Sequence, residues 1–519
     1  MKRILVILMA VFMLQAGIGF TQEKVARPTD EQLKKILADF DQYAAKAMDD
    51  WKIPGMAVGI VQDGKTIFAR GYGVKALGGD NPVTEKTIFQ IGSTTKAFTA
   101  TLAAMLVDEG KFNWDDKVVH YAPDFMMFDP WVTREFQIVD LMSQHSGLPG
   151  YAADALFSVG FDRSYIRQAL RNIKPVSSFR AKYAYQNGLW LVASQLIEKY
   201  SGKTYEQDLK ERIFDPLGMS DSSADMPSFL KAKDVSGLHV DEEDKILALP
   251  KNWGFLDWSY VAGPAGAINS NIVDMTKWLI FQMNNGKVND KQLVSEANMQ
   301  VIHSPKTIVG LGSPVHKNVF YCLGWLYQEH SPFPIIWHNG GTLMKTMVAY
   351  IPEQRIGVVV LSNYVTELPE LLAFRFFDQY AGKPVEDLSA KALAEQKKKK
   401  KEMKTKKPVA PRNPLAAMPL DRYAGKYFNE VYSTVTISVV DGKLILDIGP
   451  KKVKMSLKHW DKDIFAVNWP IYGFEQESGF AGFQVNPQGK VNGVILDFLN
   501  QDDDLGVFKR IGSEKAVPK

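Results

Sequence analysis

Ser93 and Lys96 are the residues of this chain whose types and spacing most directly suggest chemistry. A short apolar approach ends at Gly92 and a helical pattern follows, so we expect Ser93 at a helix N-terminus. Residues three apart share one face of a helix, which lets the Lys96 amine reach the Ser93 hydroxyl. A serine with a base beside it is an activated nucleophile. The alternative is a helix-capping serine followed by a solvent-facing lysine.

The Ser-x-x-Lys spacing is weak evidence by itself, because average composition produces it about twice in a chain of this length. A second copy does occur, from Ser228 to Lys231, and no other motif surrounds it. The catalytic interpretation of Ser93 therefore depends on what else the chain contains.

Two further motifs follow Ser93 in the sequence. Tyr185–Asn187 is a Tyr-x-Asn that opens a helical pattern, and His338–Gly341 follows an apolar strand pattern. Each is weak alone, since Tyr427–Asn429 and His145–Gly147 repeat the two spacings elsewhere, and His145 is expected to be a structural hydrogen-bonding residue. Chance does not readily give all three motifs in this order and in these contexts.

The elements that would position these residues are a hairpin, helices and then consecutive strands. Met56–Val61 and Thr66–Arg70 have strand patterns joined by Asp63-Gly64, a strong hairpin signal. Four later apolar runs have strand length, and a helix follows them at Leu368–Tyr380. This order predicts an α/β (α+β) domain with helices packed on an antiparallel sheet in which the two ends of the domain sequence meet. The four runs are Leu323–Gln328, Ile335–His338, Met344–Ile351 and Ile356–Leu361.

Length and composition describe a protein of more than one domain with a substantial core. The chain has 519 residues, of which 46% are hydrophobic and 23% charged. The formal net charge of +4 is small for this length and includes a local lysine run, so a nucleic-acid partner is not indicated. The single cysteine, Cys322, is expected to be a buried small hydrophobic residue.

Residues 1–21 have the pattern of a secretory signal peptide. Lys2 and Arg3 precede an almost wholly apolar run from Ile4 to Phe20. That run is also about long enough for an uncleaved membrane anchor, but small and polar residues near its end favour cleavage. We therefore expect an exported protein that is periplasmic or extracellular, with a cleavage site that the sequence leaves open.

The C-terminal third divides into a linker and a second domain. Residues 383–414 have a helix-forming, lysine-rich composition that ends in three prolines. The run Lys397–Lys401 indicates a solvated spacer, and contact with an anionic envelope surface is the alternative. Residues 415–513 contain six to eight short alternating runs separated by turn signals, which predicts a small antiparallel barrel or sandwich.

Taken together, the motifs resemble those of the serine β-lactamase-like superfamily. The branch that looks closest contains class C β-lactamases, DD-peptidases, D-aminopeptidases and esterases (peptidase S12-like). The resemblance implies a β-lactamase/transpeptidase-like hydrolase domain over residues 28–382, with a helical subdomain, and a lipocalin-like domain after the linker. It rests on Ile91–Lys96, Leu141–Pro149, Tyr185–Asn187, Pro216–Met219, Gly263–Gly266 and His338–Gly341.

The resemblance implies acyl transfer through an acyl-enzyme. Ser93 would attack a carbonyl carbon, and Lys96 and Tyr185 would pass its proton to the leaving group and then activate water. This requires Lys96 to be neutral or Tyr185 to be ionised near pH 7. Asn187 would hold Lys96 and the substrate amide, and the backbone N–H groups of Ser93 and Gly341 would form the oxyanion hole. No metal or organic cofactor is implied.

One departure from the family pattern bears on the substrate. The resemblance implies that His338, Asn339 and Gly340 bind the substrate, at the position where β-lactamases carry Lys-Thr-Gly. A neutral histidine supplies a much weaker positive field than a lysine. An ester or peptide substrate is therefore favoured over a β-lactam. Tyr151 follows the Leu148-Pro149 turn and either lines the pocket or packs structurally.

The sequence thus predicts an exported serine hydrolase of peptidase or esterase type that acts on a small peptide, amide or ester. The alternatives are a weak β-lactamase or DD-carboxypeptidase and, from another class, a non-catalytic protein that binds peptidoglycan or peptides. The sequence leaves the oligomeric state open, a homo-oligomer included.

Overall fold

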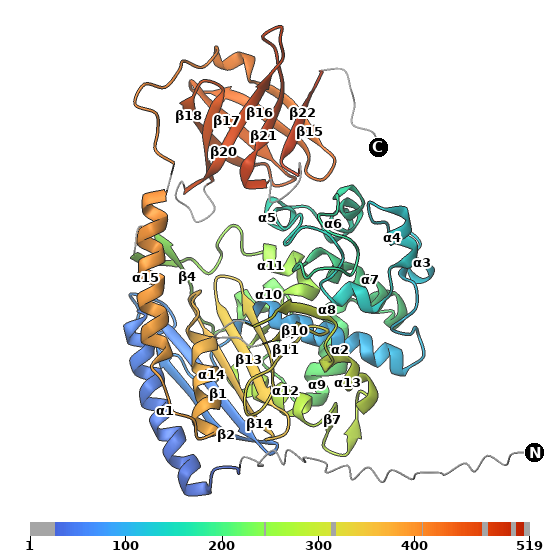
Figure 1. Cartoon of the computed structure of the whole chain (residues 1–519), viewed down its shortest axis with the longest axis vertical. Helices are drawn as coiled ribbons and strands as arrows, with labels where there is room; N and C mark the ends of the chain where they lie inside the picture. The colour runs from blue at the N-terminus through green and yellow to red at the C-terminus, as the bar shows by residue number, and fades with distance from the viewer. Residues whose placement is uncertain are drawn as a thin grey trace, which may run out of the picture.

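The computed structural model describes residues 26–242, 245–312, 318–406, 408–469, 476–499 and 505–512. These residues form a large α/β domain and a β-barrel, which stands at one end of the molecule in Figure 1. The signal peptide predicted for residues 1–21 lies outside the described part of the chain. Among the helices that the structure describes, none is long and apolar enough to cross a membrane.

Eight strands of the described chain form the main sheet, in the order β2-β1-β14-β13-β12-β11-β10-β9. The predicted hairpin is confirmed, because β1 (Gly55–Gln62) pairs antiparallel with β2 (Lys65–Gly73). β1 also pairs antiparallel with β14 (Ile356–Ser362), so the two ends of the domain sequence do meet. The other strands are β13 (Lys345–Ile351), β12 (Ile335–Gly341), β11 (Leu326–Gln328), β10 (Val319–Tyr321) and β9 (Thr307–Gly310).

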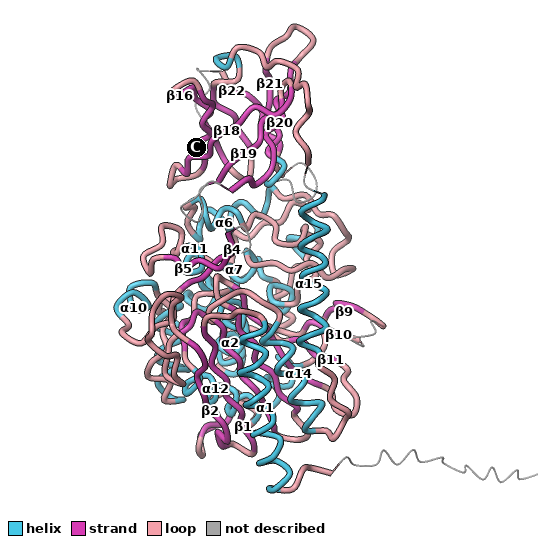
Figure 2. Tube along the Cα trace, turned by 90° about the vertical axis from the view of Figure 1, so that its left-hand side faces the viewer, coloured by secondary structure: helices cyan, strands magenta, loops and turns pink. Residues whose placement is uncertain are grey.

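Helices cover both faces of this sheet, because its central strands are apolar on both sides. One face of β1 packs against α1 (Asp30–Asp50) and α14 (Leu368–Tyr380), which Figure 2 shows side by side. The opposite face meets α12 (Ile272–Met283) so closely that a Cβ at Gly59 would lie 2.7 Å from the Ile272 side chain. We call the α1–α14 side the rear face and the α12 side the front face.

The front face also carries the helical region that contains the sequence motifs. A short 3-10 turn, η1 (Gly92–Thr94), leads into α2 (Thr95–Asp108), and Phe98 of α2 stacks on Trp278 of α12 with ring centroids 3.6 Å apart. Further α-helices of the described chain are α3 (Val118–Tyr121), α4 (Pro130–Glu135), α5 (Ala155–Val159), α6 (Arg163–Ala169), α7 (Gly188–Ser201), α8 (Tyr205–Leu209), α9 (Asp215–Leu217), α10 (Met226–Lys231), α11 (Trp258–Val261) and α13 (Glu296–His303).

Short strand pairs and single turns complete this domain. The strand pairs are β3 (Phe89–Gln90) with β6 (Asn269–Ser270), β4 (Leu238–Glu242) with β5 (Lys245–Leu249), and β7 (Lys287–Val288) with β8 (Lys291–Gln292). The remaining turns are η2 (Val139–Met142), η3 (Leu170–Asn172), the π-helical η4 (Lys210–Phe214) and η5 (Gly263–Ala265).

The segment predicted as a linker contains the helix α15 (Leu388–Lys406). Its start is fixed to α1, because the Tyr43 hydroxyl donates to Asp387 Oδ1 over 2.7 Å and Trp51 Nε1 donates to Ser389 Oγ over 2.8 Å. Lys397, Lys398 and Lys399 are exposed, which agrees with the predicted solvated character of the lysine run. α15 runs along the rear side of the molecule towards the barrel (Figure 1).

The C-terminal region is a closed barrel, which decides between the predicted barrel and sandwich. Eight strands of the described chain pair in sequence order, and β15 closes the circle on β22. Rings of Tyr423, Tyr427, Phe465 and Phe483 fill part of the interior, with Tyr423 and Phe483 centroids 4.6 Å apart. The strands are β15 (Gly425–Asn429), β16 (Ser433–Val440), β17 (Lys443–Ile448), β18 (Val453–Asp461), β19 (Ile464–Trp469), β20 (Gln476–Val485), β21 (Val491–Leu496) and β22 (Val507–Ile511), with η6 (Leu420–Arg422) and η7 (Asp497–Leu499) beside them.

Candidate active site

Ser93 and Lys96 lie in adjacent turns at the start of α2. Ser93 sits in the 3-10 turn η1 and is partly exposed, whereas Lys96 in the first turn of α2 is fully buried. Lys96 Nζ is 3.1 Å from Ser93 Oγ. The predicted contact between amine and hydroxyl is therefore present, with the hydroxyl on the accessible side.

The Tyr-x-Asn motif supplies the second wall of the site. Asn187 is the N-cap residue of α7, and its Oδ1 accepts a hydrogen bond of 2.7 Å from Lys96 Nζ. The carbonyl oxygen of Ala265 accepts a third hydrogen bond from the same amine, over 2.9 Å. The Tyr185 side chain hydrogen-bonds Ser93, and its ring centroid lies 4.7 Å from Lys96 Nζ. Ser93, Lys96, Tyr185 and Asn187 thus form one connected group.

The strand β12 forms the third wall through backbone contact with η1. A Cβ at Gly340 would lie 1.9 Å from the Ile91 carbonyl oxygen and 3.0 Å from the Ser93 nitrogen. Gly92 has φ +52°, and a Cβ there would lie 2.7 Å from the Gly341 nitrogen. Glycine is required at both positions for this approach. The backbones of Ser93 and Gly341, the predicted oxyanion donors, therefore lie next to each other.

His338 and Asn339 point to opposite faces of the sheet, as neighbours on a strand must. His338 is buried on the front face, where Nε2 lies 3.3 Å from the Tyr321 hydroxyl. Asn339 Nδ2 instead donates to Glu370 Oε1 of α14 on the rear face, over 2.7 Å. The structure thus brings His338 to the site, whereas the prediction that the Asn339 side chain binds the substrate is wrong, because that side chain lies on the rear face.

Tyr151 lies at the mouth of the site. Its backbone N–H donates to the Tyr185 carbonyl over 2.7 Å, and the two ring centroids are 5.2 Å apart. The side chain is 52% exposed, and the backbone has a positive φ of 57°. Contact with Tyr185 and exposure to solvent together place Tyr151 where an incoming substrate would meet it.

Asp154 is the main residue of the site that the sequence did not indicate. Its Oδ2 accepts a hydrogen bond of 2.6 Å from Asn187 Nδ2, so Asp154 orients the amide that holds Lys96. Its Oδ1 is buried and has no hydrogen-bond partner among the described residues. The only available signal was an acidic residue three positions after Tyr151, which does not by itself point to Asn187.

Burial sets the protonation states of these groups. Desolvation lowers the pKa of Lys96 to about 7, although the charge of Asp154 acts in the opposite direction. Desolvation also raises the pKa of Asp154 to about 7 and that of Tyr185 well above its usual range. Of the two protonation states that the mechanism could use, the site therefore favours a neutral Lys96 over an ionised Tyr185.

His338 is held neutral. Desolvation lowers its pKa to about 3, and the charge of Lys96 acts in the same direction. It therefore supplies no positive charge at neutral pH, in line with the difference from lysine noted in the sequence.

His145 and Ser228, which belong to motifs that repeat these spacings elsewhere in the chain, have structural roles. His145 Nε2 lies 2.8 Å from Asp140 Oδ1 and its Nδ1 lies 2.9 Å from Thr307 Oγ1. Ser228 bonds Asp225 through both its backbone and its hydroxyl, within the N-terminal turn of α10. His145 is thus the structural hydrogen-bonding residue that was predicted, and Ser228 lies within a helix cap.

Comparisons with known proteins agree with this architecture. The chain is similar to the unguisins hydrolase ungD of Aspergillus violaceofuscus, with 28% identity over 94% of this chain and 93% of the relative. It is also similar to the unguisins hydrolase ungD' of Aspergillus campestris, with 29% identity over 79% of each chain. Among solved structures, the octameric penicillin-binding protein homologue from Pyrococcus abyssi shares the fold, with a TM-score of 0.60 and 22% identity over 91% of this chain and 100% of that chain.

Family models cover most of the chain. The model of a domain of unknown function (DUF3471) matches residues 409–509, which include β15 to β21 and the first part of β22. The Beta-lactamase family model matches residues 40–376, a range that holds η1, α7 and β12 with all of the motifs described above. By its sequence and its fold, the chain belongs to the β-lactamase family of serine hydrolases.

Proposed function

We propose that this protein hydrolyses a small amide or ester through an acyl-enzyme on Ser93, as an exported peptidase or esterase. The observation that carries the proposal is the position of the Lys96 amine, 3.1 Å from Ser93 Oγ, with a pKa of about 7. An amine with this pKa is largely a free base at neutral pH and can accept the serine proton. The alternative from the sequence, a non-catalytic binding protein, would have no use for a buried lysine tuned in this way.

Acylation begins when neutral Lys96 takes the proton from Ser93 Oγ as that oxygen attacks the substrate carbonyl carbon. The backbone N–H groups of Ser93 and Gly341 then donate to the carbonyl oxygen as it becomes negative. Each such donor is typically worth about 3 kcal/mol of transition-state stabilisation. Asn187 holds Lys96 in line through its 2.7 Å hydrogen bond, while Asp154 fixes Asn187.

The leaving group departs with a proton from Tyr185. The phenol is neutral because burial raises its pKa, and its hydrogen bond to Ser93 places it beside the scissile bond. The proton that Lys96 gained then passes to Tyr185, which restores both groups. An amine leaves poorly without a proton, so a neutral phenol in this position suits an amide as well as an ester.

Deacylation uses the same residues in reverse. Lys96, neutral again, takes a proton from a water molecule that attacks the acyl carbon, and the Ser93 oxygen leaves with a proton from Tyr185. The products are a carboxylic acid and the released amine or alcohol. Burial of Lys96 keeps it neutral for this second step.

A β-lactamase or DD-carboxypeptidase activity is the less favoured alternative. Both substrate classes carry a carboxylate that the family recognises with a lysine at the position of His338, and His338 is buried and neutral here. The names of the two fungal relatives also describe hydrolases of other substrates, the unguisins. Placement of the activity outside the cytoplasm rests on the predicted signal peptide at residues 1–21.

Covalent labelling with a fluorophosphonate probe tests the nucleophile. The native protein should gain one adduct by intact mass, the Ser93→Ala variant none, and the matched control Ser228→Ala an adduct at the native rate. No adduct on folded native protein, or an undiminished adduct on Ser93→Ala, would contradict the proposal. A panel of p-nitrophenyl esters, amino-acid amides and nitrocefin then defines the substrate class, and nitrocefin should be the poorest substrate.

A further inference from the structure

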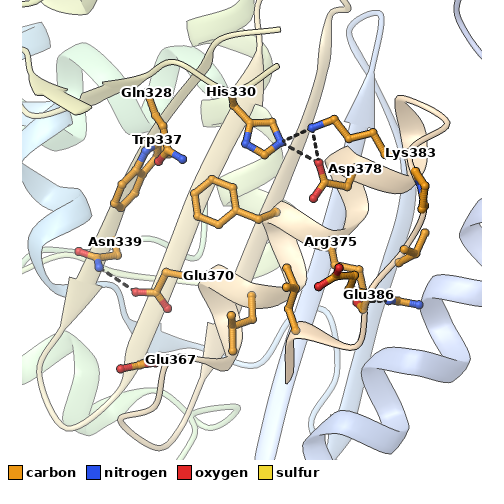
Figure 3. Close-up of a pocket in the computed structure, with 15 residues that line it drawn as sticks. Gln328, His330, Trp337, Asn339, Glu367, Glu370, Arg375, Asp378, Lys383 and Glu386 are labelled. Carbon is orange, nitrogen blue, oxygen red and sulfur yellow. Dashed lines mark hydrogen bonds and ion pairs between the residues drawn. The ribbon is translucent and has the colours of Figure 1, made fainter. Parts of the chain in front are cut away.

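A second cavity lies on the rear face of the sheet, away from Ser93. It has a volume of about 770 Å³ and lies between β11–β12, α14 and the loop that follows α14. Figure 3 shows Gln328, Trp337 and Asn339 on the strand side and Glu370 on the helix side. We call this cavity the rear pocket, and its remaining wall includes Phe374 and Val385.

The rear pocket exists because the rear helices cover only part of the sheet. Helices α1 and α14 pack on the faces of β1, β13 and β14. β12 and β11 lie beyond β13 in the sheet order, so their rear side meets only the edge of α14. There the ring of Trp337 packs against Phe374, with centroids 5.9 Å apart, and the loop Lys383–Leu388 closes the far side.

Buried polar atoms that lack partners among the described residues occur on both walls of the rear pocket. They are Nε1 of Trp337 on the strand side, and Oε2 of Glu370 and Nε of Arg375 on the helix side; the two nitrogens can only donate. The other carboxylate oxygen of Glu370, Oε1, is fully used, because it binds Lys345 Nζ and Asn339 Nδ2, both at 2.7 Å. Buried polar groups are rarely left unpaired, so a ligand that supplies hydrogen-bond acceptors to the two nitrogens and a donor to the carboxylate oxygen would complete this site.

The charges that line the rear pocket disfavour an anionic ligand. Glu367, Glu370, Asp378 and Glu386 outnumber Arg375 and Lys383. Lys383 is already engaged by Asp378 over 2.8 Å. A fatty acid would place its carboxylate among these groups, whereas a neutral amide would not.

We infer that the rear pocket is a binding site for a short apolar peptide, held through its backbone. A peptide group carries both a C=O, which accepts from Trp337 Nε1, and an N–H, which donates to Glu370 Oε2. Apolar side chains of the peptide pack on Leu371, Phe374 and Val385. The site is distinct from the catalytic site, since Trp337 and Asn339 face the rear while His338 and Gly340 face the front.

Calorimetry on the full-length Ser93→Ala protein tests this inference, because this variant cannot turn the peptide over and binding does not depend on the proposed function. The probe is N-acetyl-leucyl-phenylalanine methylamide, which lacks charged ends. It should bind in a 1:1 ratio, and dodecanoate should bind more weakly. Absence of binding up to the solubility limit of the peptide, or tighter binding of dodecanoate, would overturn the inference.

Three second-site variants locate the binding. Trp337→Phe keeps the ring contact but loses the N–H, and Glu370→Gln replaces the carboxylate, so each should weaken binding by about fivefold or more. Val385→Trp fills the pocket from an exposed loop position and should abolish binding. The matched controls are Trp131→Phe and Val439→Trp, both at exposed positions away from the pocket, and they should bind as the parent does. Unchanged binding in all three pocket variants would assign the peptide to another surface and refute the site.

Discussion

At the scale of single residues, the proposed activity depends on one buried amine. Lys96 is fully buried, and in the proposed mechanism its neutral form accepts the Ser93 proton. Because burial lowers its pKa to about 7, the reactive fraction grows as the pH rises through 7 and levels off above it. We expect the rate of fluorophosphonate labelling to follow that curve between about pH 5 and pH 9.

The control for this profile is the rate of probe hydrolysis in buffer, subtracted at each pH. A labelling rate that stays flat over the range, or that falls as the pH rises, would mean that Lys96 is not the base.

Asp154 should set the midpoint of the same profile. Its negative charge favours the protonated form of Lys96 and so raises the pKa of that amine, against the larger effect of burial. Asp154→Asn removes the charge but keeps an oxygen that can accept from Asn187 Nδ2. The labelling midpoint should therefore move below pH 7, as measured by the same pH series. Asp162→Asn, a helix cap in the neighbouring α6, is the matched control and should leave the midpoint in place.

At the scale of elements, β12 lies between the candidate active site and the rear pocket and contributes residues to both. Its even-numbered residues His338 and Gly340 face the side of Ser93, while Trp337 and Asn339 face the rear pocket. On the rear face, Glu370 of α14 accepts a hydrogen bond from Asn339 of this strand and forms an ion pair with Lys345 of β13. The position of Gly341 beside Ser93 therefore depends on contacts made on the opposite side of the sheet.

Glu370→Gln tests that dependence in the native background. The ion pair with Lys345 has side chains that are only 17% and 16% exposed, so its loss should lower the free energy of unfolding by about 1–2 kcal/mol. Labelling of Ser93 should slow by about threefold, because misplacement of the oxyanion donors weakens transition-state stabilisation. Thermal unfolding and labelling kinetics measure the two effects.

Glu367→Gln is the matched control, because Glu367 is the exposed N-cap residue of α14 and its side chain makes no capping hydrogen bond, so neither quantity should change. A normal labelling rate in a destabilised Glu370→Gln variant would show that the position of β12 beside Ser93 does not depend on the contacts of Glu370.

The sequence predicted elements whose signals are local. Asp63-Gly64 marked the β1–β2 hairpin because a tight turn depends on adjacent residues, and Tyr185–Asn187 marked the start of α7 for the same reason. Side chains alternate between the two faces of a strand, so the sequence also predicts that His338 and Asn339 of β12 point to opposite sides. The role of Asp154 could not be predicted from the sequence, because it comes from a tertiary contact with Asn187, which lies 33 residues away.

At the scale of the whole molecule, the barrel is seated on the region that holds the active site. The turn between β15 and β16 makes two contacts there: the Tyr165 hydroxyl donates to the Val431 carbonyl over 3.1 Å, and Asn172 Nδ2 donates to the Glu430 carbonyl over 3.0 Å. Lys451, after β17, forms an ion pair of 2.5 Å with Asp257. Apolar residues of the barrel and of the front-face helices belong to one continuous core.

Tyr432 in this turn is buried close to the catalytic group. Its side chain is 3% exposed, and burial raises the pKa of its hydroxyl above the usual range, with a smaller contribution from the charge of Asp154. Asn429 holds the turn by accepting from the backbone N–H groups of Val431 and Tyr432, over 2.8 and 2.9 Å. We therefore expect the barrel to contribute to the burial that raises the pKa of Asp154.

Tyr432→Ala, a substitution in the barrel, should therefore change the labelling rate of Ser93 in the catalytic domain. Water admitted beside Asp154 would lower the pKa of its carboxyl group, and the resulting anion would raise the pKa of Lys96. Labelling of Ser93 should slow by about tenfold at pH 7, and the midpoint of the pH profile should move upward. Phe483→Ala makes a comparable cavity inside the barrel and serves as the control, since it should destabilise the barrel without moving the midpoint. If both variants leave the midpoint at its native pH, the barrel does not affect the pKa of Lys96. The exclusion of water from Asp154 would then come from the catalytic domain alone.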